Sequence, residues 1–482
     1  DDTWRYRAAK FVRRHRLGVA AAAFAFLSLF GGLLGALTQA RIAAREAERA
    51  TATRDFIVKG LIQLTDPDAP GEVLDQTFTQ RELITALIER LGTLVDPLDR
   101  ASVMDAIAFI SIEYTWFEQA ETLLLDAYRA KVEALGPAHP DLSETLLGLG
   151  LVAQNTGRPV RADSLYRRGL DVLGGSDADP SPLRLDLQLN LAFINDDRGR
   201  YEEALAWGRR AVAMSEALLD DRPEDPDVQL AWALARRILA TVQYHRGDLE
   251  QAQRWFLEAL RRLDVTFARP RSETANTLMM LARVQRNLGE LRSAEQSILR
   301  AVSIYEAVYP PDHFTHGRGY YALAQLYHRN LDEPAQAARY YRRALAVERA
   351  TGRPRDPLFT LIAYGQLLLS TGAAAEAESV LGEALGLYAA LAAQPPGLAP
   401  GDSLYEAYTR LWLGQSLLEQ QRLDDAEQAL RRSYAFYRTR PGHAHAGLVL
   451  TTLGQLYRAQ EQPDSAAVFE RRYERWEAMQ GE

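Results

Sequence analysis

A small residue recurs about every 42 residues along roughly the last four fifths of this chain, and this repeat constrains the fold more than any other feature. The recurring residue is alanine, and a second small residue lies twelve positions before it, or thirteen in one copy. Two antiparallel helices approach closely only where the side chains between them are small, so the spacing predicts helical hairpins. The nine alanines are Ala120, Ala162, Ala204, Ala252, Ala294, Ala337, Ala377, Ala426 and Ala466. The earlier small residues are Ala108, Gly150, Ala192, Ala240, Ala282, Ala324, Gly365, Gly414 and Gly454.

Apolar residues at helical spacing accompany the small ones. In one copy Leu278, Leu281 and Val284 form a stripe that ends at the glycine-containing turn 287–290. One hairpin cannot bury both of its apolar faces, so neighbouring hairpins must stack. The sequence therefore predicts an all-α array with a concave face over residues 100–482.

At these small positions the chain resembles the tetratricopeptide repeat family, whose first helix carries Leu-Gly and whose second helix carries spaced alanines. Leu149-Gly150 and Leu413-Gly414 are examples. The period is longer than the usual 34 residues. With the loop 135–141, it looks like the extended repeats of kinesin-light-chain-like arrays and many bacterial signalling proteins. The resemblance implies a right-handed superhelix of about nine hairpins.

Composition excludes several function classes. The 482 residues include no cysteine and carry a net charge of −8, which argues against thiol chemistry, zinc ribbons and general nucleic-acid binding. Only Lys10, Lys59 and Lys131 are lysines, and no Gly-Lys pair exists to form a phosphate-binding loop. The chain also lacks the His-Arg-Asp and Asp-Phe-Gly motifs of protein kinases. We therefore expect no catalytic residue in this chain.

Weak motifs for cofactors and metals have simpler explanations. The strings 148–153 and 317–322 match a loose dinucleotide fingerprint, but both fall where the array places a helix and neither follows a strand. We therefore expect no cofactor, and we expect the histidines below to cap loops, because no third metal ligand lies near them. Two histidine pairs have short spacing: His313 with His316, and His443 with His445.

The segment Leu17–Leu37 holds 21 residues without a charge, enough for a helix that spans a hydrocarbon core about 30 Å thick. A cleaved signal peptide and a buried core helix are the alternatives. More basic residues precede the segment than follow it, which predicts a cytoplasmic N-terminus and an extracytoplasmic array in a single-pass inner-membrane protein. Gly31 and Gly35 could pair two such helices into a homodimer, although ordinary glycine usage explains them as well. The flanking basic residues are Arg5, Arg7, Lys10, Arg13, Arg14 and Arg16 before it, and Arg41, Arg45 and Arg49 after it.

These observations predict four segments: a basic juxtamembrane segment at 1–16, a transmembrane helix at 17–37, a helical stalk with entry helices at 38–99, and the array at 100–482. The basic string 10–16 followed by a span, a stalk and repeats resembles the region after the catalytic domain of bacterial transmembrane serine/threonine protein kinases. The resemblance implies that a kinase domain precedes this chain and that the array acts as its sensor or docking arm. The alternative is a standalone anchored scaffold for an envelope complex.

The concave face is the predicted binding site for a protein or peptide. Guanidinium groups there could hold acidic side chains or a terminal carboxylate, and tyrosines would add apolar area. Ordinary solvated arginines explain the same pattern. The residues that the repeat register places on this face are Arg237, Tyr244, Asn276, Arg283, Arg286, Arg318, Tyr321 and His328.

Overall fold

The structure is a computed structural model, and it describes residues 80–174, 180–269, 271–311, 313–352, 355–393 and 400–480. All regular secondary structure in these residues is helical, which confirms the predicted all-α class. The chain divides into two compact units, residues 1–214 and 215–482. This division has no counterpart in the repeat spacing, and its boundary falls within one helix.

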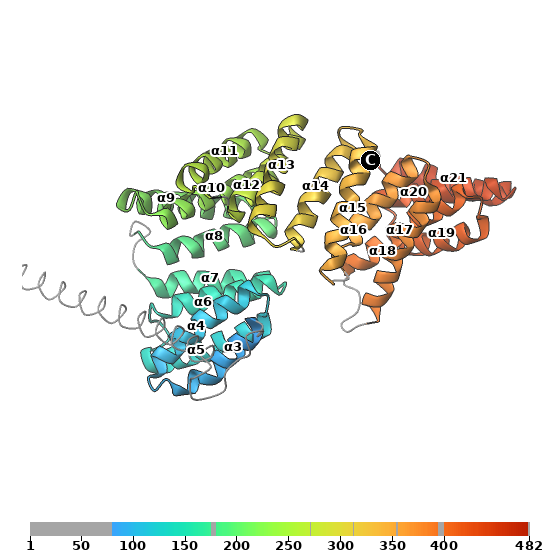
Figure 1. Ribbon diagram of the computed structural model, residues 1–482. Helices are drawn as coiled ribbons and strands as arrows, with labels where there is room; N and C mark the ends of the chain where they lie inside the picture. Colours follow the sequence, from blue (N-terminus) through green and yellow to red (C-terminus); the bar gives the residue numbers. More distant parts are fainter. Residues whose placement is uncertain are drawn as a thin grey trace, which may run out of the picture. The chain divides into compact units, whose positions relative to one another are not determined.

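The first unit holds a short entry helix followed by stacked hairpins, coloured blue to green in Figure 1. In the segment predicted to hold entry helices, 38–99, residues 80–93 form an α-helix and a 3₁₀ turn. The elements are α3 (Gln80–Glu89), η1 (Arg90–Thr93), α4 (Pro97–Glu113), α5 (Phe117–Leu135), α6 (Leu142–Asn155), α7 (Pro159–Leu173), α8 (Pro182–Asp197) and α9 (Tyr201–Asp221), which contains the unit boundary.

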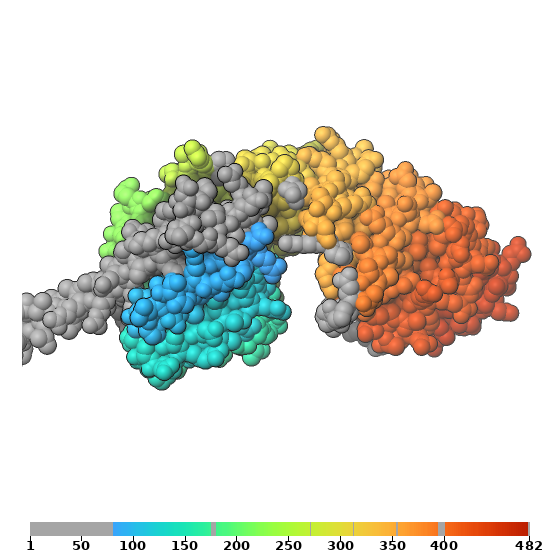
Figure 2. Space-filling model, turned by 60° about the horizontal axis from the view of Figure 1, so that its bottom comes forward, coloured from blue at the N-terminus to red at the C-terminus, as the bar shows by residue number. Residues whose placement is uncertain are grey.

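The second unit continues the alternation of helices and appears from green to red in Figures 1 and 2. In every hairpin from α4 onward the even-numbered helix comes first, and we call it the first helix and its partner the second helix. The elements are α10 (Pro226–Arg246), α11 (Leu249–Thr266), α12 (Ser272–Asn287), α13 (Leu291–Val308), α14 (Phe314–Arg329), α15 (Pro334–Ala350), α16 (Leu358–Ser370), α17 (Ala374–Ala392), α18 (Pro400–Glu419), α19 (Leu423–Tyr437), α20 (Ala444–Ala459) and α21 (Pro463–Gln480).

The small residues set the distance between the two helices of a hairpin, as predicted. All nine second-helix alanines are at most 2% exposed. The large side chain four residues after the alanine lies over the small residue of the first helix. A Cβ atom at Gly150 would lie 2.2 Å from the ring of Tyr166, and one at Gly414 would lie 2.5 Å from Leu430. A larger first-helix residue would therefore force the hairpin apart.

The turn inside each hairpin follows one rule that the sequence reading missed. The residue five positions before the second-helix alanine has a positive φ in all nine hairpins. Glycine adopts this left-handed conformation without a steric penalty. The glycines at this position are Gly157, Gly199, Gly247, Gly289 and Gly372, and the other residues are Thr115, Asp332, Gln421 and Glu461.

The apolar core of the second unit consists of clusters that extend from one hairpin into the next, because neighbouring hairpins pack on each other. One apolar cluster runs from Ala282 to Tyr388 and so joins several hairpins. Successive first helices such as α14, α16 and α18 contact one another more closely than successive second helices do. The row of first helices is therefore the shorter one, and it forms the inner face of this unit.

The predicted membrane localisation is corrected by the structure. Among the described residues, no helix is long and apolar enough to cross a membrane. The most apolar of them, α16, has 13 residues and is therefore only about 20 Å long, short of a core about 30 Å thick. The prediction of a single-pass inner-membrane protein with an extracytoplasmic array is thus not upheld. The predicted span itself, Leu17–Leu37, lies outside the described residues, as do the juxtamembrane segment and most of the stalk.

Candidate functional site

Four of the eight predicted residues line one groove on the inner face of the second unit. Arg283 and Arg286 extend from α12, and Arg318 and Tyr321 from α14. The groove has a volume of about 710 Å³. We call it the inner groove. Its remaining walls include Met279, Met280, Ile298, Gln325, Arg329, Glu348, Asp356, Phe359 and Thr360.

The three predicted arginines of the inner groove lack ionic partners. Within the part of the chain that the structure describes, no carboxylate lies within ion-pair distance of Arg283, Arg286 or Arg318. Among the described residues, the one hydrogen-bond contact of the Arg283 side chain is a weak one to the sulfur of Met280 at 3.8 Å. Arg286 is half-buried and the other two are exposed. Their guanidinium groups therefore keep donors free for a ligand.

An acidic region lies in the same groove. The Glu348 side chain of α15 is buried, and its Oε1 accepts a hydrogen bond of 3.0 Å from the Thr360 hydroxyl. Its Oε2 has no hydrogen-bond partner among the described residues. Burial raises the pKa of Glu348 to about 7. Asp356 accepts a bond of 2.8 Å from the Thr351 hydroxyl. The inner groove thus combines unpaired arginines with a partly protonated buried acid at neutral pH.

Two other predicted residues contribute to a cluster at the start of the inner face. The side-chain oxygen of Asn276 accepts a hydrogen bond of 2.8 Å from the hydroxyl of Tyr305. Arg237 has a buried Nε with no hydrogen-bond partner among the described residues, and burial lowers the pKa of its guanidinium. Burial likewise raises the pKa of Tyr305 to about 12. Neither Arg237 nor Asn276 lines the inner groove.

The last two predicted residues are bonded to neighbouring helices. The Tyr244 hydroxyl accepts a bond of 3.3 Å from Asn287 on the next first helix. His328 Nδ1 lies 3.1 Å from the Tyr341 hydroxyl, and burial lowers the pKa of this imidazole. These two side chains connect helices of the array, and neither lines the inner groove.

The glycines of the two fingerprint strings serve packing. Both strings lie inside helices, α6 and α14, and not at a turn after a strand. A Cβ atom at Gly148 would lie 2.7 Å from Leu124, and one at Gly319 would lie 2.7 Å from Val302. Glycine is therefore required there by neighbouring side chains.

The histidine pairs occupy helix starts. His313 caps α14 by accepting a bond from the Thr315 amide, and His443 caps α20 by accepting one from the His445 amide. His316 Nε2 lies 2.9 Å from the carbonyl oxygen of Pro310. Across the described ranges, no group of three His, Cys, Asp or Glu side chains could hold a metal ion.

Sequence reasoning missed the acidic residues of the inner groove. The position eleven residues after the second-helix alanine is apolar or aromatic in several hairpins, including Leu263, Tyr305, Tyr388 and Tyr437. Glu348 stands at the same position in its hairpin. A charged residue at a position that is otherwise buried and apolar is the sequence signal that could have identified it.

Comparison with known proteins agrees with this architecture. Four stretches match family models described as tetratricopeptide repeat, at residues 184–227, 229–307, 320–355 and 407–432. The chain therefore carries tetratricopeptide repeats, as the resemblance at the small positions implied. Among curated proteins, it is 26% identical over 145 residues to amyloid protein-binding protein 2 of Rattus norvegicus and of Mus musculus. That match covers 28% of this chain and 24% of the relative, so the chain spans about a quarter of the length of these relatives.

Solved structures show a similar fold at low sequence identity. A signal transduction ATPase with a tetratricopeptide repeat sensor from Pyrococcus horikoshii superposes with a TM-score of 0.53 at 12% identity, covering 82% of this chain and 64% of that chain. BtubC from P. vanneervenii has a TM-score of 0.44 at 18% identity, covering 50% and 93%. These similarities concern the repeats, and none of them supports the predicted relation to membrane-anchored kinases.

Proposed function

We propose that the second unit is a non-catalytic interaction module that binds a carboxylate-bearing peptide or protein segment in the inner groove. The observation that carries the proposal is the convergence of Arg283, Arg286 and Arg318 on one groove without ionic partners. A guanidinium group can hold a carboxylate by two parallel hydrogen bonds. Tyr321 and Phe359 add aromatic surface beside these charges.

The size and charge of the inner groove suit a few side chains of a peptide. A volume of about 710 Å³ lies in the usual range for binding sites in proteins. The whole chain carries a net charge of −8, so the arginines of the groove form a local positive region on an acidic protein. Such a region attracts an acidic segment more strongly at low ionic strength.

The proposal is tested with the full chain and a panel of short fluorescent peptides. Each acidic peptide of the panel is paired with a version in which Gln and Asn replace Glu and Asp. We expect anisotropy to report binding of acidic members only, and the double variant Arg283→Ser/Arg286→Ser to weaken it by about tenfold or more, because two charge-assisted contacts are lost.

A matched control separates site-specific loss from loss of charge. Arg254 and Arg261 are exposed residues of the second helix α11, outside the inner groove. Arg254→Ser/Arg261→Ser removes the same charge and is expected to leave the affinity unchanged. Equal affinities for the two double variants, with helix content preserved in both, would show that the inner groove does not bind these peptides.

The predicted coupling to a serine/threonine kinase is the finer part of the proposal. It depends on the resemblance of the string 10–16, which lies outside the described residues. In that arrangement the array would report ligand binding to an attached catalytic domain. The codons upstream of Asp1 test it: an in-frame Asp-Phe-Gly motif supports the coupling, and a nearby start codon refutes it and leaves a standalone scaffold.

A further inference from the structure

Neighbouring second helices of the second unit are joined by one ion pair that recurs at the same register. One partner lies six residues after the alanine of its helix, and the other lies twelve residues after the alanine of the preceding second helix. The third pair has the charges exchanged. We call each pair a rung. The rungs are Arg300–Asp264 at 2.5 Å, Arg343–Glu306 at 3.2 Å and Glu383–Arg349 at 2.6 Å.

The next rung, between α17 and α19, is missing. Arg432 stands six residues after Ala426, as the register requires. The position for its partner, twelve residues after Ala377, is occupied by Ala389. Arg432 consequently forms no ion pair or hydrogen bond with any described residue. The rung is missing because the side chain of Ala389 carries no carboxylate.

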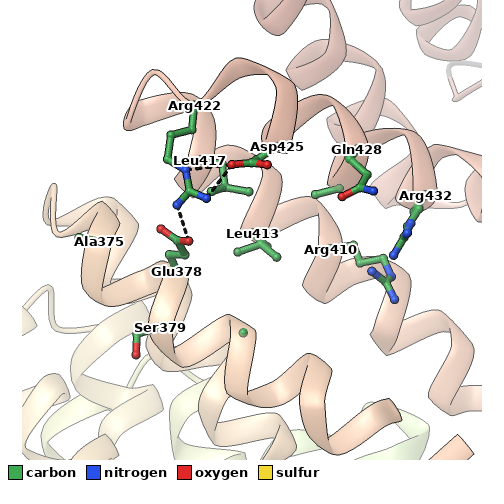
Figure 3. A pocket seen from close by; sticks show the side chains of 12 residues that line it. Ala375, Glu378, Ser379, Arg410, Leu413, Leu417, Arg422, Asp425, Gln428 and Arg432 are labelled. Carbon is green, nitrogen blue, oxygen red and sulfur yellow. Dashed lines mark hydrogen bonds and ion pairs between the residues drawn. The ribbon is translucent and has the colours of Figure 1, made fainter.

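Arg432, the remaining member of this rung, lines a pocket. It lies between α17, α18 and α19 and has a volume of about 500 Å³. In Figure 3 the guanidinium groups of Arg410 and Arg432 lie side by side at one end, with Gln428 beside them. No atom lies within 4 Å of the place where a Cβ of Gly382 would project, so this wall is open. We call this site the outer pocket, and its apolar floor is formed by Leu413, Leu417 and Ala429.

The charges of the outer pocket are unbalanced at one end only. At the other end, Arg422 donates to Glu378 and to Asp425, both at 2.6 Å (Figure 3). Arg410 donates to Glu406 at 2.6 Å, so Arg432 is the guanidinium group at this end that has no carboxylate partner among the described residues. An acidic group entering there would meet an unneutralised positive charge above an apolar floor.

The following step, between α19 and α21, lacks a rung for a different reason. Arginines occupy both of its register positions, Arg438 and Arg472. Arg472 there donates to the hydroxyl of Tyr434 at 2.5 Å and so has a partner within the fold. At the outer pocket, by contrast, the corresponding arginine of the later helix, Arg432, has no such partner among the described residues.

We infer that the outer pocket is a docking site for an acidic side chain of a partner polypeptide, which completes the missing rung in trans by pairing with Arg432. Charge complementarity selects a carboxylate as the partner of Arg432, because each of the three preceding rungs pairs one arginine with one carboxylate. The apolar floor favours the aliphatic part of a Glu side chain over a bare ion. The outer pocket shares no lining residue with the inner groove, so it is a separate site and does not depend on that groove.

The test places a reporter in the pocket of the full chain. The protein has no cysteine, so Ser379→Cys, at an exposed pocket residue, gives one labelling site for an environment-sensitive fluorophore. The probe is acetylated, amidated tetraglutamate. We expect a saturable change in fluorescence that is weakened by about tenfold in Arg432→Gln and by a similar factor in Ala389→Glu, which supplies the missing carboxylate in cis.

Ala389→Gln is the matched control, because it adds the same bulk without a charge. Residues 389 and 432 are both exposed, so these variants should retain the helix content of the parent. Probe binding that is equal in Ala389→Glu and Ala389→Gln, or unaffected by Arg432→Gln, would overturn the inference. A response to inorganic phosphate without a response to tetraglutamate would also overturn it. Arg283→Ser/Arg286→Ser should leave this signal unchanged, which separates failure here from failure of the inner groove.

Discussion

Lys131 in the first unit and Glu348 in the second occupy the same position of the repeat, eleven residues after the second-helix alanine. Both side chains are buried, at 5% and 7% exposure, where other hairpins bury leucine or tyrosine. Their surroundings differ. Lys131 Nζ lies 2.5 Å from Asp105 and donates hydrogen bonds to the Asp141 carbonyl and the Thr145 hydroxyl. Glu348 accepts one hydrogen bond, from the Thr360 hydroxyl, and has no cation within ion-pair distance among the described residues.

The comparison shows two uses of a buried charge in one architecture. Burial raises the pKa of Asp105 to about 6 although Lys131 opposes the shift, and it raises the pKa of Glu348 to about 7 with mainly a hydroxyl opposing it. The Lys131 cluster is neutralised inside the fold and therefore has a structural role. Glu348 lines a groove, so the charge that would neutralise it can come from outside the fold.

The largest effect is expected from Lys131→Met, which would make the first unit resemble the second. It leaves Asp105 buried without a cation, and breaking a buried pair in this way costs about 3–5 kcal/mol. Urea unfolding at neutral pH measures the loss. Adding Asp105→Asn to this variant should recover part of it, because the stranded charge is removed. A loss below about 1 kcal/mol would mean that the pair is not a structural element.

Glu348→Gln is expected to have the next largest effect on the free energy of unfolding, and this variant should stabilise the protein. The pKa of Glu348 is about 7 in the fold and near 4.5 otherwise, so folding favours the protonated form. Stability is therefore lost as pH rises from about 4.5 to about 7, by about 3 kcal/mol in total. Glutamine removes this penalty. Unfolding at pH 5 and pH 8 should show the variant gaining much more stability over the parent at pH 8 than at pH 5; an equal difference at both values would contradict the assignment.

Thr360→Val should have the smallest effect and would sharpen the comparison. It removes the hydroxyl that donates to Glu348 at 3.0 Å. A hydrogen bond to a charged group contributes about 1.5–3 kcal/mol and one to a neutral group about 1 kcal/mol. We therefore expect a larger loss of stability at pH 8 than at pH 5, measured by thermal unfolding. In the Glu348→Gln background the dependence on pH should disappear, and its persistence would point to another titrating group.

Much of the fold could be predicted because helix pairs depend on local spacing. Alanine and glycine at fixed intervals identified every hairpin from Ala108 to Ala466, since those side chains touch within a hairpin. The division near residue 214 could not be predicted, because α9 continues through it with the repeat register intact. The non-glycine turns such as Gln421 were also missed, since their left-handed backbone is imposed by the packed helices on either side.

The candidate site was predictable only where the helix register decides it. Arg283, Arg286, Arg318 and Tyr321 face the inner groove because their positions on the first helices point them there. Asn276 and His328 share that register, but Tyr305 and Tyr341 from other helices already bond them. Such contacts depend on how far a side chain reaches across helices, which spacing along one helix does not give.

The left-handed turn residue lies five positions before the second-helix alanine in all nine hairpins, whereas successive alanines are 40 to 49 residues apart. Deleting one residue between turn and alanine would rotate the second helix by about 100° and bring its alanine to the surface. Extra residues between hairpins leave the spacing between the turn residue and the alanine unchanged. Variation in the length of the hairpins thus falls outside the stretch from turn to alanine, in the far ends of the helices and in the connections between hairpins, and a whole hairpin is the natural unit of duplication or exchange.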